Sequence, residues 1–186
     1  FFKIQFGKFL TPFGIWNVEH GAPILPSIRV PATISYGFFP NNQMGINFHG
    51  NKLLGSWEFD YNLYVSNGRA VWGIENNENK GIGAGINFKA PTKFLKKLVF
   101  GASYYTGKEV LEAQQKYYAQ YYNTAGETEL LTFYDSIRNA ADEYSVAFHL
   151  ATGYKKLELN AEYILNKIDY ENNVGIDNLN YRLFYR

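Results

Sequence analysis

SWEFDYNLYVS, residues 56–66, alternates apolar and polar side chains along its whole length. Because successive side chains of a β-strand point to opposite faces, Trp57 and Phe59 fall on one face and Glu58 and Asp60 on the other. The length of the stretch also suits a tilted bilayer-spanning strand, which needs roughly 9–11 residues. We therefore predict a strand here, with one apolar and one polar face.

The same alternation recurs along the rest of the chain. The further segments are residues 2–9, 43–49, 81–89, 98–105, 143–150, 157–166 and 179–186. The connections after the second, fourth and sixth segments are compact, whereas the others are mostly longer and more polar. Short turns at one end and long loops at the other are typical of outer-membrane barrels. The pattern predicts an all-β fold, an antiparallel transmembrane β-barrel with eight strands in this chain.

The composition agrees with a β-rich membrane protein. Aromatic residues make up 18% of the 186 residues, with 16 Tyr and 15 Phe, which favours strands and membrane interfaces. No apolar run approaches the roughly 18 residues of a membrane helix. With no cysteine, disulfides and thiolate metal sites are excluded. The net charge of +1, without a basic cluster, argues against nucleic acid as a partner.

Two long connections stand out. Five of the six prolines fall in residues 10–42, and because proline cannot donate to a sheet ladder we predict a long structured loop there. This loop either folds into the lumen as a constriction or caps the barrel mouth. The constriction candidates are Lys8, Glu19, His20 and Arg29. Residues 107–141 are predicted to be a long extracellular loop, whose centre, EVLEAQQKYYAQYY at 109–122, favours a short helix.

The polar rows of the eight segments form the predicted pore lining. They contain Lys3, Gln5, Asn47, His49, Glu58, Asp60, Asn62, Asn87, Lys89, Glu143, His149, Glu158, Asn160, Glu162, Arg182 and Arg186. The charges in this set have both signs, which predicts a mixed lining.

The opposite rows are rich in aromatic residues. They contain Phe2, Phe6, Trp57, Phe59, Tyr61, Phe88, Phe100, Tyr104, Tyr144, Phe148, Tyr163, Tyr181 and Tyr185. In a soluble protein these side chains would pack against a second sheet, whereas on a barrel exterior those near strand ends would form interfacial girdles. We favour the girdles, because the other face carries most of the charged side chains.

An enzyme would have to use the three histidines or the carboxylates of Glu58 and Asp60. No catalytic triad order, histidine pair at metal-ligand spacing or phosphate-binding glycine loop is present. Glu58 and Asp60 share a face about 7 Å apart, by the strand rise of roughly 3.3 Å per residue. That spacing would suit paired-carboxylate chemistry or a bound cation, but we interpret the two carboxylates as part of a hydrated pore wall. We expect no catalytic residue, bound metal or cofactor.

The first segment and its loop resemble a known family. IQFGKFLTPFGIWNVEH at residues 4–20 is similar to the strand-and-loop motif of bacterial porins of the phosphate-selective porin O/P-like group and related general porins, and YNLYVSNG at 61–68 resembles the same group. The resemblance implies a homotrimeric channel of about sixteen strands that passes small hydrophilic solutes. The mixed lining favours general passage of solutes over phosphate selectivity.

Because the alternation is already running at the first residues and continues to Arg186, we expect the chain to be part of a larger barrel. The predicted function is passive diffusion through a water-filled lumen in the bacterial outer membrane, in contact with lipid and lipopolysaccharide. Two alternatives are a small closed outer-membrane barrel with an anchoring or adhesion role, and a soluble β-domain that binds a ligand through its aromatic face.

Overall fold

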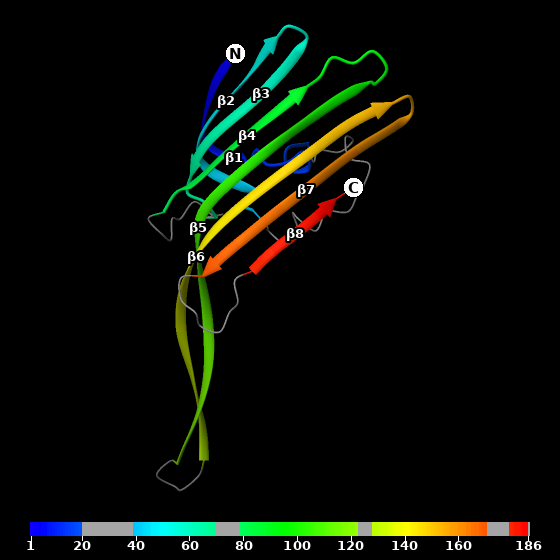
Figure 1. Ribbon diagram of the computed structural model, residues 1–186. Helices are drawn as coiled ribbons and strands as arrows, with labels where there is room; N and C mark the ends of the chain where they lie inside the picture. The colour runs from blue at the N-terminus through cyan, green and yellow to red at the C-terminus, as the bar shows by residue number, and fades with distance from the viewer. Residues whose placement is uncertain (20–38, 70–78, 123–127, 171–178, 186) are drawn as a thin grey trace.

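One antiparallel sheet runs through the computed structural model (Figure 1). The structure describes residues 1–19, 39–69, 79–122, 128–170 and 179–185. Each strand pairs with the next along the chain, so the order in the sheet is β1 to β8. The strands in this part of the chain are β1 (Phe2–Leu10), β2 (Asn42–Leu54), β3 (Trp57–Ser66), β4 (Gly81–Lys89), β5 (Lys97–Tyr122), β6 (Thr128–Tyr154), β7 (Leu157–Tyr170) and β8 (Leu179–Tyr185).

The prediction of an all-β antiparallel fold is confirmed, and each predicted alternating segment coincides with a strand, apart from Ser56 in a turn and Arg186 outside the described residues. The sheet is open, because β1 and β8 are its edges and no pairing joins them in the described residues. A short helix, α1 (Trp16–Glu19), follows β1. Among the described residues, no helix has both the length and the apolar character to cross a bilayer.

Three short connections lie together at one end of the sheet, which we call the turn end. They are residues 55–56, 90–96 and 155–156. Gly55, with φ of 62°, and Lys155, with φ of 51°, supply the left-handed backbone that a tight hairpin needs. The strand ends that the other connections join lie at the opposite end of the sheet, which we call the loop end.

Residues 107–141 differ from the prediction of a loop with a short helix. They belong to β5 and β6, whose register continues from Gly107↔Glu143 to Tyr122↔Thr128. In Figure 1 this hairpin projects beyond the other strands at the loop end. The helix prediction is wrong because helix propensity is a weak preference, which the continuous cross-strand ladder outweighs.

The register divides the side chains between two faces. The inner face contains the row Asn47, Tyr64, Gly83, Tyr105 and Ser145, which are successive cross-strand partners. The outer face contains the neighbouring rows, among them Phe48, Leu63, Ala84, Tyr104 and Val146. The inner face holds most of the buried side chains, and the outer face holds most of the exposed apolar ones.

The segment after β1 covers part of the inner face. Figure 1 shows it behind the strands, on the side turned away from the viewer. A small aromatic core forms where it meets the sheet, and Trp16 packs against this core. Its buried members are Phe9, Phe13, Phe39, Tyr64, Tyr105, Ala147 and Ile164. Gly83 is necessary here, because a Cβ at this position would lie 2.1 Å from the Tyr64 ring.

Candidate functional site

Hydrogen bonds fix residues 11–19 to the inner face. The backbone N–H of Trp16 donates to Oε1 of Glu162 at 2.7 Å, and the N–H of Ile15 donates to the same oxygen. The N–H of Gly14 donates to Oγ of Ser103 at 3.2 Å. Glu162 is only 4% exposed. The described part of the predicted 10–42 loop therefore lies against the strands and not outside their ends.

A second set of hydrogen bonds holds the start of this segment. Thr11 Oγ1 donates to the carbonyl of Pro40, and Gln43 Nε2 donates to Thr11 Oγ1 at 3.0 Å. Ser66 Oγ donates to Gln43 Oε1, and Asn17 Nδ2 donates to the carbonyl of Thr11 at 2.7 Å. Because Thr11, Asn17, Gln43 and Ser66 are all buried, the network is shielded from water.

A cleft of about 710 Å³ opens between this segment and strands β1 to β4. Pro12 and Val18 line it from the segment. Most of the rest of the lining is polar and comes from the predicted pore residues. These are Lys3, Gln5, Lys8, Asn47, His49, Glu58, Asp60, Asn62 and Lys89. The structure thus brings together half of the predicted pore lining and one constriction candidate, Lys8.

The charges in the cleft are divided between its walls. On β4, the ammonium of Lys89 lies 2.8 Å from Oδ2 of Asp60 and 3.1 Å from Oε1 of Glu58. On β1, Lys3 and Lys8 are exposed and form no ion pair within the described part of the chain. The carboxylates of Glu58 and Asp60 therefore share a lysine, as a hydrated polar wall would, and the cleft carries a small positive excess.

Glu143 lies on the inner face as predicted, but it is 1% exposed and pairs with an arginine. Nε of Arg69 donates to Oε2 at 2.7 Å, and its terminal nitrogen donates to Oε1. Asn166 Nδ2 donates to Oε1 at 3.0 Å and to Ser145 Oγ at 2.8 Å. The alternation of strand residues could not reveal Arg69, because it lies in a connection.

The remaining predicted residues of the lining and the constriction fall into two groups. Asn87, His149, Glu158 and Asn160 lie in inner-face rows outside the cleft lining. His149 is 6% exposed, and its Nδ1 has no hydrogen-bond partner among the described residues. The last group lies outside the described residues or side chains, and consists of Glu19, His20, Arg29 and Arg186.

Arg182 lies in β8, whose side chains are not among the described ones, so its predicted place in the lining stays a prediction. The register pairs it with Leu165, a residue of the outer face, whereas Tyr185 pairs with Glu162 on the inner face. Apolar residues occupy both rows of this segment, so its alternation alone does not fix which row faces inward.

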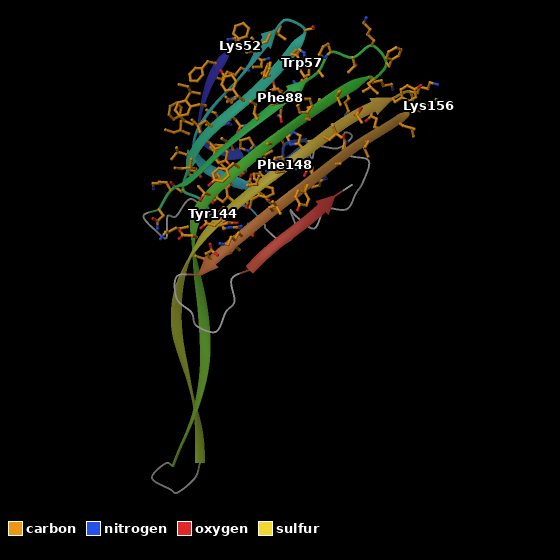
Figure 2. The ribbon with its side chains drawn as sticks, viewed as in Figure 1. Lys52, Trp57, Phe88, Tyr144, Phe148 and Lys156 are labelled. Atoms are coloured by element: carbon orange, nitrogen blue, oxygen red, sulfur yellow. The ribbon has the colours of Figure 1, made fainter. Side chains whose placement is uncertain are left out.

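The outer face has the opposite character (Figure 2). Phe6 is 71% exposed, Leu63 is 51% exposed and Phe148 is 52% exposed. Figure 2 shows side chains such as those of Trp57 and Phe88 standing along the face of the sheet nearest the viewer. The polarity of an ordinary globular domain is thus inverted at these positions, because the carboxylates of Glu143 and Glu162 are covered whereas large apolar groups of the outer face are uncovered.

The described residues contain no group of three or more His, Asp or Glu side chains placed to hold a metal ion. Comparison of the chain with protein-family models, with curated proteins and with solved structures gave no match. The resemblance of residues 4–20 to porins therefore stays a prediction, and the function is argued from the geometry of the two faces.

Proposed function

We propose that this chain forms part of a bacterial outer-membrane β-barrel through which small hydrophilic solutes diffuse passively. The inverted polarity of the sheet carries the proposal. Glu143 and Glu162 are buried on the inner face, whereas Phe6, Leu63 and Phe148 are more than half exposed on the outer face. In water, such a broad apolar surface would make molecules of the protein associate with one another, whereas in a bilayer the surface contacts lipid acyl chains.

The height of the apolar face agrees with the thickness of a membrane. In β6 the outer row runs from Tyr144 to Tyr154, ten residues apart. At about 3.3 Å per residue this distance is about 33 Å along the strand, and a tilt of about 40° reduces it to roughly 25 Å. The apolar band of outer-membrane barrels is about 25 Å tall. The two tyrosines then lie at the positions of the interfacial aromatic girdles.

The inner face supplies what a diffusion pathway needs. The polar cleft offers hydrogen-bonding partners and charges of both signs to a hydrated solute. The segment 11–19 narrows the space beside it, and Lys8, Lys89 and the two carboxylates of Glu58 and Asp60 bias the passage of ions. Diffusion of this kind requires no catalytic residue.

We further propose that additional strands complete the barrel. An eight-stranded barrel has an interior just wide enough for side chains, which leaves no room for an inserted loop and an open cleft. Within the described part of the chain the outer edges of β1 and β8 have no strand partner, so they offer backbone groups to further strands. A homotrimer of barrels of about sixteen strands, with lipopolysaccharide around the outer leaflet, is the assembly that the porin resemblance implies.

Planar-bilayer recording of the full-length protein tests this function. We expect discrete, ohmic conductance steps, because a water-filled lumen conducts in proportion to voltage. As a control, the same preparation heated above its unfolding temperature should give none. A protein that stays monodisperse in buffer without detergent, and adds no conductance to the bilayer, would contradict the proposal.

A further inference from the structure

An apolar pocket of about 380 Å³ lies on the outer face near the turn end. Its walls are Leu54, Trp57, Phe59, Phe88 and Phe100. The rings are held against one another, with centroids 4.8 Å apart for Phe59 and Phe88 and 5.3 Å apart for Phe88 and Phe100. Such rings, fixed by their neighbours, form a preorganised surface for an aliphatic chain.

A lysine lies at the edge of this pocket. Lys52 is the cross-strand partner of Phe59, and Phe59 is in turn the partner of Phe88, which pairs with Phe100. Directly opposite residues on one face have Cβ atoms about 5 Å apart, so the ammonium of Lys52 is within reach of a group bound over the pocket. Lys52 is exposed and forms no ion pair with the described residues.

The residues around the pocket add positive charge, and the nearest acidic residues lie on the other face of the sheet. The turn end also carries Lys93, Lys96, Lys155 and Lys156 in its connections. Glu58 and Glu158, the acidic residues nearest this end in the described strands, belong to inner-face rows. An occupant of the pocket therefore meets an apolar floor and a cationic rim.

We propose that Lys52 and this pocket bind one anionic glycerophospholipid, with an acyl chain over the rings and the phosphate against the ammonium. The inference rests on the proposed membrane location, in which the short turns face the periplasm and the turn end meets the phospholipid leaflet. A free phosphate would leave the apolar floor uncovered, and a neutral acyl chain would leave the lysine without a partner.

Fluorescence quenching of Trp57 tests the site. In a protein carrying Trp16→Phe and Trp72→Phe, Trp57 is the remaining tryptophan and lines the pocket. The protein is reconstituted in phosphatidylcholine vesicles containing a fixed fraction of lipid with brominated acyl chains, as either phosphatidylglycerol or phosphatidylcholine. We expect brominated phosphatidylglycerol to bind beside Trp57 about fivefold more strongly, the factor that corresponds to about 1 kcal/mol for one lysine near an anionic headgroup.

Two variants distinguish a specific lipid site at Lys52 from a general attraction of anionic lipid to the positive charge of the turn end. Lys52→Gln should abolish the preference for phosphatidylglycerol, whereas Lys156→Gln, which removes the same charge from the turn between β6 and β7, should retain it. Equal quenching by both lipids in the parent protein, or equal loss in the two variants, would overturn the lipid site while leaving the membrane location intact. Absence of quenching by either lipid would instead refute the proposed membrane location, and the lipid site with it.

Discussion

Replacement of Glu162 by glutamine tests whether one carboxylate holds the segment 11–19 on the inner face. Oε1 of Glu162 accepts the N–H groups of Ile15 and Trp16. Glutamine keeps the size of the side chain and one acceptor oxygen, but it removes the negative charge. The variant therefore changes the strength of two hydrogen bonds and leaves the packing of the segment unaltered.

The size of the effect follows from the charge. A hydrogen bond to a charged group contributes about 1.5–3 kcal/mol, and a neutral one about 0.5–1.5 kcal/mol. Two bonds that each lose about 1 kcal/mol lower the free energy of opening the segment by about 2 kcal/mol. Since 1.4 kcal/mol is a factor of ten, the open population should rise about 30-fold in Glu162→Gln.

Hydrogen exchange followed by mass spectrometry measures this opening directly. Amides of residues 11–19 should exchange about 30-fold faster in Glu162→Gln, and the single-channel conductance should rise because the segment leaves the inner face more often. Glu158→Gln is the matched control, since Glu158 lies in the same inner-face row of β7 but has a 58% exposed side chain. Identical exchange in the two variants would show that Glu162 does not anchor the segment.

Three further variants probe the inner face. Arg69→Met should lower the free energy of unfolding by about 3–5 kcal/mol, because it leaves the buried Glu143 carboxylate unpaired. Addition of Glu143→Gln should recover part of that loss in thermal denaturation, and no recovery would contradict a charge effect. Gly83→Ala should cost about 1–3 kcal/mol, because its Cβ would lie 2.1 Å from the Tyr64 ring. The cost should shrink when Tyr64→Ala is also present, which a double-mutant cycle measures. Lys89→Gln should raise the potassium-to-chloride permeability ratio by up to about 16-fold, because one charge about 5 Å from an ion in water changes the energy of that ion by about 0.8 kcal/mol, a factor of about four, in opposite senses for the two ions. An unchanged reversal potential would place Lys89 outside the ion pathway.

The sequence predicted the strands well wherever one row is apolar and the other polar. In β3, Glu58 and Asp60 fall on the inner face and Trp57 on the outer face, as the alternation requires. In β8 the two rows are both partly apolar, so the alternation alone does not decide which row faces inward. The pattern of one strand cannot determine its register when either face could be buried.

The site was predicted only in part, for a physical reason. Lining residues such as Asn47 and Glu58 follow from period-two alternation within one strand. The hydrogen bonds of Glu162 and Ser103 to the segment 11–19, and the ion pair between Arg69 and Glu143, depend on which distant segments come together. A single sequence contains no local signal for such contacts. The long β5–β6 hairpin was missed for a related reason, since within the described residues no other strand pairs with its projecting part.

The anchoring of the segment also constrains the shape of the sheet. β1 and β7 are six positions apart in the strand order, which is about 29 Å in a flat sheet with strands about 4.8 Å apart. The five residues from Leu10 to Ile15 span at most about 18 Å, and a glutamate side chain adds about 5 Å. The hydrogen bonds from Ile15 and Trp16 to Glu162 can therefore form only if the sheet curves around the segment. A sheet that curves toward its polar face and presents its apolar face outward agrees with the barrel wall that we propose, and the same two hydrogen bonds link the segment 11–19 to this curvature.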